Sequence, residues 1–427
     1  MHRQHPRIYI GGNVYGAGNI GDDAILQGIL HLLGRIVPQA SIVVGTYDGA
    51  ALEFLPATVE CVKAFDLKEV MLAIRGCDWF ICGGGTLIGD ELGLAFPVVY
   101  TAKLVSAAKL HGKRVSMVSV GANKLQSEEA VRAGRTMVGL CDLITLRDEE
   151  SRQVCLSLGS DPRHTFTTAD PVVLLGAVET ARTKELKERL RAGSKVFGVN
   201  VVNEAWVQCD GYKRGIAEAC DQLAERHGYT PVFFCNEVRP GPFFDFEANR
   251  STVQFLRGKY ELLDPVYYSP GEMIDIHAAF DFVLGMRMHS LLFAALAGVP
   301  FSAVSRVDKV DNFMRLFDLE PSGSVDRCDA GQIVNDVEAL LLRHSSVGED
   351  VAGRVARLRQ DYLGNEALLT GLLNERRLMW HKVTFSSARL LPAGSSFLGI
   401  LTRLLWLGGA MCRAPRRWWR LSLKMRN

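Results

Sequence analysis

The sequence lacks the cysteine pattern of a structural metal site or a disulfide framework. Its ten cysteines are scattered singly, with no Cys-x-x-Cys pair and no Cys/His cluster at zinc spacing. This usage is typical of buried thiols in a reducing compartment, and we expect no metal site. The apolar run Ile8-Tyr9-Ile10 is also too short for the core of a signal peptide. We therefore expect a cytoplasmic protein.

Long apolar runs are missing as well. The most apolar segment, residues 390–412, is interrupted by Arg403 and falls short of the roughly 18–20 residues needed to span a bilayer. A helix there would place Phe397, Ile400 and Leu404 on one face, with Arg403 on the opposite face. The pattern favours a helix that lies on a surface over one that crosses a membrane.

Acidic residues are absent from the end of the chain. After Glu375 the last 52 positions hold none, but they hold eleven Arg or Lys, including the cluster RRWWR at residues 416–420. Guanidinium groups and indoles both suit the headgroup layer of an anionic membrane. We predict that this tail attaches the protein peripherally to the inner face of the cell membrane. Packing of the tail on the protein or on a partner copy, and true membrane spanning, are the alternatives.

The rest of the chain has an ordinary globular composition. Its 427 residues are 48% hydrophobic and 22% charged, which suits a folded chain long enough for two domains. Short apolar runs alternate with helical periodicity in two series, and a charged helix at residues 183–192 lies between them. This alternation predicts parallel sheets that are covered by helices on both faces.

The expected elements follow one another along the chain. Strands are expected at residues 7–11, 41–45, 79–82, 115–120, 143–146, 169–172, 196–201, 231–235, 282–285 and 300–304. Further helices are expected at residues 22–36, 69–75, 97–111, 215–227 and 290–297. We predict an α/β fold in which two doubly wound Rossmann-like domains face a cleft (GT-B-like), with a C-terminal basic amphipathic extension. The three parts are expected at residues 1–180, 195–380 and 385–427.

The first glycine-rich turn has the sequence GAGNIG at residues 16–21, between a strand and a helix, as in a dinucleotide-binding site. The loop from residue 11 is longer than that site requires, however, and two carboxylates occupy the first helical turn. A pyrophosphate there would meet like charges. We interpret Asn19 as the helix N-cap and expect Asp22 and Asp23 to accept hydrogen bonds from sugar hydroxyls. A purely structural role of the two aspartates at the helix start is the alternative.

A second glycine-rich turn, GGGTLIGD at residues 83–90, follows a buried strand. The carboxyl ends of parallel strands border the crevice where such sheets bind ligands. We expect Gly84 and Gly85 to bring the backbone close to the substrate. Asp90 has no evident structural role in the sequence, and we assign it to substrate binding.

A third turn, GMRMHS at residues 285–290, joins a strand to a helix and carries a cation and a proton-exchanging group. The guanidinium of Arg287 and the helix amides suit a phosphate or a carboxylate. His289 is the side chain there that exchanges a proton near neutral pH. Ser290 begins the helix, and Lys309 follows the next strand over the same crevice. A structural histidine and a surface Lys–Asp pair are the alternatives.

Taken together, these stretches resemble the polysaccharide pyruvyl transferase family. The resemblance extends over roughly residues 7 to 320 and rests on an ordered set of motifs: GxGNIGDDAI from residue 16, GGGTLIGD from residue 83, RDExS from residue 147, RxHS from residue 287 and DKVxxF from residue 308. Asp23 departs from the family's usual Glu, and Thr86 stands where another glycine is common. The tail after about residue 385 is not part of the family pattern.

The resemblance implies a GT-B-like fold and transfer of a pyruvyl group from phosphoenolpyruvate to two hydroxyls of one sugar, forming a cyclic ketal. It implies that Arg287 binds the anion and that His289 is the acid/base group. The acceptor would be a glycan or lipid-linked sugar in a cell-surface or exopolysaccharide precursor. We expect no cofactor, since phosphoenolpyruvate is a substrate, and no nucleic-acid partner; an oligomer is compatible with the sequence.

Two alternatives come from different classes of protein. One is a GT-B glycosyltransferase with a nucleotide-sugar donor, for which Glu272 is the candidate ribose-binding residue. The other is a non-catalytic scaffold that recruits a polysaccharide assembly complex to the membrane, and such a protein would tolerate loss of His289.

Overall fold

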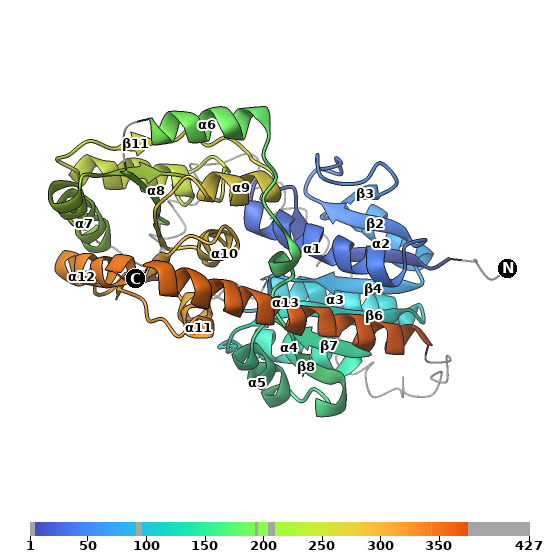
Figure 1. The fold of residues 1–427 in the computed structure, drawn as a ribbon. Coiled ribbons are helices and arrows are strands. Elements are labelled where there is room, and N and C mark those ends of the chain that lie inside the picture. The colour runs from blue at the N-terminus through green and yellow to red at the C-terminus, as the bar shows by residue number, and fades with distance from the viewer. Residues whose placement is uncertain (1–4, 91–95, 193–194, 204–209, 343, 375–427) are drawn as a thin grey trace. The chain divides into compact units, whose positions relative to one another are not determined.

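The computed structural model describes residues 5–90, 96–192, 195–203, 210–342 and 344–374. In this part of the chain the strands form two parallel sheets (Figure 1). The first has the order β3-β2-β1-β4-β6-β7-β8, with β5 paired to β6. Its strands are β1 (Arg7–Tyr15), β2 (Ser41–Thr46), β3 (Glu60–Lys63), β4 (Trp79–Gly83), β5 (Thr86–Ile88), β6 (Arg114–Ala122), β7 (Leu143–Leu146) and β8 (Thr165–Thr167).

The second sheet has the order β11-β10-β9-β12-β13-β14. Its strands are β9 (Lys195–Asn200), β10 (Tyr229–Phe233), β11 (Glu261–Leu262), β12 (Val283–Gly285), β13 (Phe301–Ser305) and β14 (Gly323–Ser324). In both sheets the first strand lies between the second and the fourth strand, which is the Rossmann order. The order in which strands are added therefore switches from one side of the sheet to the other between β1 and β4 and between β9 and β12. The predicted pair of doubly wound sheets is confirmed.

Helices connect the strands. They are α1 (Ile20–Ile36), α2 (Leu67–Gly76), α3 (Phe96–Leu110), α4 (Glu128–Leu140), α5 (Glu149–Ser157), α6 (Ala181–Arg191), α7 (Gly211–His227), α8 (Asp245–Thr252), α9 (Pro270–His277), α10 (Met288–Leu296), α11 (Asp308–Leu316), α12 (Ala330–Leu342) and α13 (His344–Asn374). Short 3-10 turns lie at η2 (Pro162–His164), η3 (Pro171–Leu174) and η4 (Val253–Phe255).

The structure corrects two expectations about local structure. Residues 169–172 are not a strand: Asp170 caps the 3-10 turn η3, because the proline that follows has no backbone N–H for a sheet. The true strand of this region is β8, which ends three residues before Asp170. The first strand is also longer than expected, since β1 continues past a register shift to Tyr15, whose buried hydroxyl donates to the carbonyl of Gly83 at 2.7 Å. Much of the supposed loop from residue 11 is therefore strand.

One hydrophobic cluster includes residues of both sheets and of the helices that follow them. Ile25 and Ile29 of α1 belong to it, as do Leu291 of α10 and Tyr362 of α13. Helix α13 contacts α1, η3 and β7 as well as α10 and α12, so the last described helix returns from the second sheet to the first (Figure 1). Burial of this shared cluster stabilises residues 5–374 as one unit.

In the described part of the chain, no helix is both long enough and apolar enough to cross a membrane. The predicted basic tail at residues 385–427 lies outside the described residues, so its membrane attachment stays a prediction.

Candidate functional site

The candidate site lies at the carboxyl ends of the strands where each sheet changes winding direction. The first glycine-rich turn follows β1, the second follows β4, and the third follows β12. Crevices at such positions bind ligands in open α/β sheets. Two of the candidate turns therefore lie at the β1/β4 switch point, and the third lies at the β9/β12 switch point.

The helix start predicted at the first turn is present. Asn19 is the N-cap of α1, and its side-chain oxygen accepts a hydrogen bond from the amide of Gly21 at 3.1 Å. The backbone of Asn19 also pairs antiparallel with Glu237, which follows β10. Thus the cap is shared with the second half of the molecule, because a loop of that half lies directly against it.

The two aspartates of this turn have different surroundings. Asp22 is half-buried, and it accepts a hydrogen bond from the side-chain amide of Asn13 at 3.1 Å. Asp23 is fully buried and accepts from the amide of Gly16 at 2.7 Å and from the hydroxyl of Tyr267 at 2.8 Å. Asp22 can therefore still meet a ligand, whereas Asp23 joins α1 to the segment before α9.

Burial raises the pKa of Asp23 to about 6, because desolvation of the carboxylate outweighs the stabilisation by the two hydrogen bonds. The nearby charge of Asp22 raises the pKa further. Asp23 thus titrates at a higher pH than an ordinary aspartate.

The glycines of the second turn are required by close packing. Gly84 and Gly85 both have positive φ, 51° and 69°. A Cβ on Gly84 would lie 2.0 Å from Ile25 of α1, and one on Gly85 would lie 2.8 Å from the amide of Asn13. These positions admit glycine alone, because they let α1 and the Asn13–Asp22 pair approach the end of β4. The turn brings Gly85 close to Asp22, so the first two glycine-rich turns lie side by side.

Asp90 has a structural role that the sequence did not reveal. It is buried, and its two carboxylate oxygens accept hydrogen bonds from the backbone amides of Gln126 and Ser127 at 2.7–3.1 Å. These residues lead into α4. Asp90 therefore holds that loop, and its expected contact with substrate has no support in this arrangement.

Arg287 caps α10 and faces two carboxylates. Its guanidinium lies 2.6 Å from Glu237 and 2.6 Å from Asp245, both of which are buried. Asp245 in turn accepts from Asn200, which accepts from the hydroxyl of Ser290 at 3.1 Å. Ser290 and Arg287 therefore belong to one internal network, in which the positive charge of Arg287 is already compensated.

His289 lies on a different side of the same helix start. A Cβ on Gly21 would be 2.3 Å from its Nδ1, so the imidazole packs directly on α1 at this glycine. Its Nε2 is 3.6 Å from Oδ2 of Asp170, which precedes η3. The third glycine of the first turn therefore makes room for a side chain of this protein and not for a dinucleotide.

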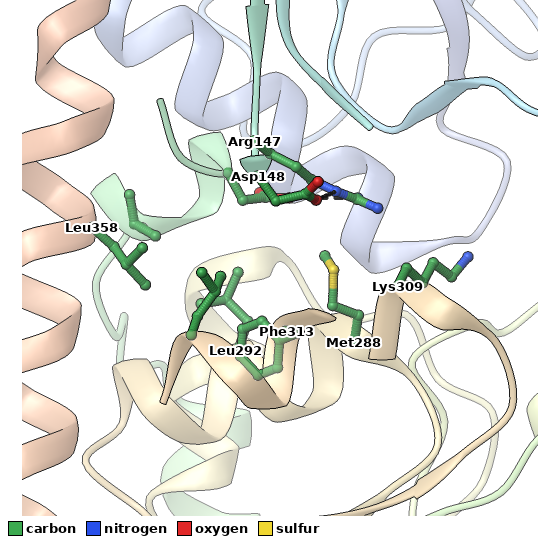
Figure 2. A pocket seen from close by; sticks show the side chains of 10 residues that line it. Arg147, Asp148, Met288, Leu292, Lys309, Phe313 and Leu358 are labelled. Carbon is green, nitrogen blue, oxygen red and sulfur yellow. Dashed lines mark hydrogen bonds and ion pairs between the residues drawn. The ribbon is translucent and has the colours of Figure 1, made fainter. Parts of the chain in front are cut away.

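A pocket opens beside this pair (Figure 2). Arg147 and Asp148 line one side, Met288, Leu292, Phe313 and Lys309 line the opposite side, and Leu358 of α13 lies at one end. Asp170 also lines it. The pocket thus combines two cationic side chains from different halves of the molecule with the carboxylate that faces His289.

Arg147 is held rigidly at this pocket. It is 6% exposed, and its guanidinium contacts Asp148 at 3.3 Å, the hydroxyl of Thr86 at 3.3 Å and Asp170 at 3.9 Å. A Cβ on Gly121 would come within 2.7 Å of the guanidinium. Fixed donors of this kind bind an anion at little entropic cost.

The sequence reasoning did not assign Arg147 or Asp170 to the site. Arg147 belongs to the RDExS motif, which served only to recognise the family. Asp170 was placed in a strand, although the Asp-Pro step with an apolar residue after it is also the signature of a capped turn. Among the described residues, no group of three or more His, Cys, Asp or Glu side chains could hold a metal ion.

Two sheets in Rossmann order, with a site between their strand ends, define a GT-B-like α/β protein. A putative UDP-N-acetylglucosamine 2-epimerase from Listeria monocytogenes has a similar structure, with a TM-score of 0.59 at 13% identity over 87% of this chain and 97% of that one. Anabaena HepE in complex with UDP-glucose gives a TM-score of 0.56 at 13% identity, covering 86% of this chain and 99% of that one. The predicted fold class is confirmed.

Residues 19–308 match the polysaccharide pyruvyl transferase family, and because this is more than half of the chain, the protein belongs to that family. The suspected family is thereby confirmed. The chain is also 26% identical over 208 residues to the catalytic subunit of dihydroorotate dehydrogenase B (NAD(+)) from Streptococcus pneumoniae. That match covers 45% of this chain and 65% of the relative, so the chain spans less than two thirds of the relative's length.

Proposed function

We propose that this protein transfers the pyruvyl group of phosphoenolpyruvate to two hydroxyls of a sugar, forming a cyclic ketal and releasing phosphate. The observation that carries the proposal is the pocket in which Arg147 and Lys309 lie on opposite sides, beside the Asp170–His289 pair. Phosphoenolpyruvate has a phosphate and a carboxylate, and two cations on opposite sides of a pocket suit two anionic groups. Membership of the family supports the same reaction.

The reaction balances without an oxidant or a reductant. One acceptor hydroxyl adds to the enol carbon while the methylene carbon gains a proton and becomes a methyl group. The second hydroxyl then displaces phosphate from the same carbon. Two C–O bonds and one C–H bond form, while the C=C π bond, one C–O bond and two hydroxyl O–H bonds break. One of the two hydroxyl protons balances the proton that the methylene carbon gains, and the other leaves with phosphate or solvent. The site must therefore supply a proton and stabilise two anions.

The acceptor contacts are proposed at the first turn. Asp22 and Asn13 form a half-buried pair at the end of β4, and both can exchange hydrogen bonds with hydroxyls. Arg287 was the expected anion site, but it is not among the residues that line the pocket, whereas Arg147 and Lys309 line it and are proposed for phosphoenolpyruvate. We accordingly assign the donor to the pocket of Figure 2.

A nucleotide-sugar enzyme is the second candidate, since HepE is bound to UDP-glucose in a similar fold. Glu272, the residue expected to bind the ribose in such an enzyme, has little support for that role. Glu272 accepts hydrogen bonds from Arg182, Thr180 and Ser269. Burial alone would raise the pKa of Glu272, but these donors, Arg182 first, lower it to about 2. The carboxylate is therefore committed within the protein.

The test is to incubate the full chain with phosphoenolpyruvate and a panel of glycan acceptors, and to measure phosphate release together with acceptor mass. We expect acceptor-dependent phosphate and a ketal-sized mass increase. Release of UDP from UDP-glucose, with no phosphate from phosphoenolpyruvate, would support the nucleotide-sugar enzyme. Turnover that survives His289→Gln would exclude His289 as the proton donor, and absence of both activities would favour a scaffold.

The pocket assignment is tested with Lys309→Ala. Removing one cation should raise KM for phosphoenolpyruvate about 10-fold or more, with a smaller change in KM for the acceptor. The matched control is Arg315→Ala on the same helix, whose side chain is half exposed. It should leave both constants unchanged, since exposed ion pairs contribute little. Equal effects of the two substitutions would contradict the assignment.

A further inference from the structure

Exposed aromatic side chains gather on the surface of the first half of the molecule. Phe65 is 45% exposed and Phe96 is 38% exposed, and their ring centroids are 6.3 Å apart. The half-buried ring of Tyr100 stacks on Phe96 at 5.6 Å and lies 6.0 Å from Phe65. Apolar residues exposed singly are ordinary, but a cluster of them marks an interaction surface. We call these three residues the aromatic patch.

The fold builds the aromatic patch from two separate segments. Phe65 lies between β3 and α2, whereas Phe96 begins α3 and Tyr100 follows one turn later. The hydroxyl of Tyr100 donates to the carbonyl of Ala64, which ties α3 to the segment that carries Phe65. The protein itself therefore holds the three rings together, and no ligand is needed to assemble them.

Lysines border the aromatic patch. Lys68 lies in the first turn of α2, three residues after Phe65, and Lys103 follows Tyr100 by one turn on the same side of α3. Both lysines are exposed, and within the described residues neither forms an ion pair. The sequence of α3 contains no acidic residue. The exposed side of α3 thus presents aromatic and cationic groups together.

The aromatic patch adjoins the turn that we propose for the acceptor. Thr101, the residue after Tyr100, donates from its hydroxyl to the carbonyl of Gly12 at 3.4 Å. Gly12 directly precedes Asn13, which pairs with Asp22. A surface that docks on the aromatic patch is therefore brought close to the acceptor turn.

The size and charge of this surface indicate its partner. Three partly exposed rings offer roughly 300 Å² at most, well below the roughly 800 Å² that each side of a stable protein–protein interface buries. Lysine is also depleted in such interfaces. Aromatic rings beside lysines suit the headgroup layer of an anionic membrane, where rings reach the apolar boundary and ammonium groups meet phosphates.

We propose that the aromatic patch and its lysines dock on an anionic lipid surface, with the rings of Phe65 and Phe96 entering the boundary between headgroups and acyl chains. This inference goes beyond the proposed function and does not depend on it. The predicted basic tail provides a second attachment, since one weak anchor gives only marginal, reversible membrane binding. Docking through the aromatic patch sets the acceptor turn beside the membrane, where a lipid-linked sugar is presented.

The first test measures co-sedimentation of the full chain, without substrate, with phosphatidylcholine vesicles that contain about one third phosphatidylglycerol. Phe65→Ser combined with Phe96→Ser should lower the partition coefficient about 10-fold or more, because two rings no longer enter the lipid. The matched control is Phe243→Ser, since Phe243 is 57% exposed but follows β10 in the second half. It should change the partition coefficient less than about 2-fold.

The second test concerns the lysines. Lys68→Gln combined with Lys103→Gln should lower partition to the same vesicles about 10- to 30-fold, because each lysine near an anionic surface contributes roughly a factor of five. On vesicles of phosphatidylcholine alone the change should stay below about 2-fold. Equal losses on both kinds of vesicle would contradict the electrostatic part of the proposal.

Unchanged partition of the Phe65→Ser, Phe96→Ser protein would overturn the proposal. Two further results would also overturn it by assigning the aromatic patch to another occupant. If the tail covers it, the double substitution should lower the melting temperature of the full chain more than that of a chain that ends at residue 384. If a second copy covers it, the parent protein should sediment as a dimer and the double variant as a monomer. Absence of phosphate release from phosphoenolpyruvate would refute the proposed function and leave the vesicle result standing.

Discussion

At the residue scale, the glycines of the first turn show how one motif can serve different chemistry. Gly21 has helical backbone within α1, so its role is steric and not conformational. The space where its Cβ would be is filled by the imidazole of His289. A dinucleotide site and this site both need a small residue there, because a pyrophosphate in one case and the His289 ring in the other must approach the start of the helix closely.

Gly21→Ala should therefore impair the site. The new methyl group would displace the ring of His289, and a shift of about 1 Å in a reacting group costs about 100-fold in turnover. The control is Gly34→Ala near the end of the same helix, where nothing lies within 4 Å of the new Cβ. That variant should keep its turnover and gain about 0.5–1 kcal/mol in unfolding free energy. Steady-state kinetics and urea unfolding of both variants check this, and equal turnover would contradict it.

Asp23 makes the stability of the protein depend on pH. Its pKa is about 6 in the folded protein and about 3.9 in an unfolded chain, so between these values the folded state binds more protons. The contribution of Asp23 to stability therefore falls as the pH rises from about 4 to 6. Asp23→Asn should remove this fall and raise the unfolding free energy at pH 7.5, relative to pH 4, by up to about 3 kcal/mol.

Tyr267→Phe provides a check of opposite sign. Its hydroxyl lowers the pKa of Asp23, so its loss should steepen the fall in stability with pH. Urea unfolding at pH 4, 5, 6 and 7.5 measures both variants against the parent protein. If both curves parallel that of the parent protein, Asp23 does not titrate in this range.

At the scale of elements, the start of α10 separates two side chains that are only two residues apart. Arg287 lies with Glu237 and Asp245, whereas His289 faces α1 and Asp170. A helix turns about 100° per residue, so residues i and i+2 point to different sides. The motif therefore supplies one residue to the Glu237–Asp245 network and one to the contact with Asp170, which lines the pocket.

Arg287→Ala should act mainly on stability. It would leave the buried carboxylate of Asp245 without its cation, although Asn200 and two backbone amides still donate to it. We expect a loss of about 3 kcal/mol in unfolding free energy, and Asp245→Asn in the same chain should recover part of it. The control, Arg250→Ala, breaks an exposed pair on α8 and should cost less than about 0.5 kcal/mol. A stable Arg287→Ala protein with a raised KM for phosphoenolpyruvate would restore Arg287 as the anion site.

At the scale of the whole molecule, α13 joins the two sheets. Arg359 donates to the carbonyl of Val173 at 2.7 Å, and Asn365 donates to Ser119 at 3.5 Å, both in the first half. Arg354 donates to the carbonyl of Leu316 in the second half at 3.0 Å. Leu358, between these contacts, lines the pocket. A helix late in the chain thus completes a site whose motifs all precede it.

The tail beyond α13 gives a prediction about localisation. A chain that ends at residue 384 retains all described elements, so its melting temperature and its turnover with a water-soluble acceptor should match those of the full chain. It should lose binding to anionic vesicles, because eight of the eleven cationic residues after Glu375 are removed with the amphipathic segment. Co-sedimentation with anionic and with zwitterionic vesicles measures this, and equal binding by both chains would disprove the membrane prediction.

The sequence by itself determined the two parallel sheets, most strand positions and the three turns that border the site. These follow from local patterns: apolar runs of strand length, helical periodicity and glycine placement. It also placed Asn19 correctly as a cap, because capping depends on residues within one turn. The family followed from the order of the motifs.

Only the tertiary structure decided which polar residues face one another. Asp90 and Asp23 are committed to partners far along the chain. Asp170 faces His289, and Arg147 and Lys309 line opposite sides of one pocket. Nothing in the local sequence records such pairs, since burial and distance between distant segments arise from packing alone. The spacing of Arg287 and His289 was visible in the sequence, but which of them faces Glu237 and Asp245 and which faces Asp170 depended on the neighbours of each side of one helix.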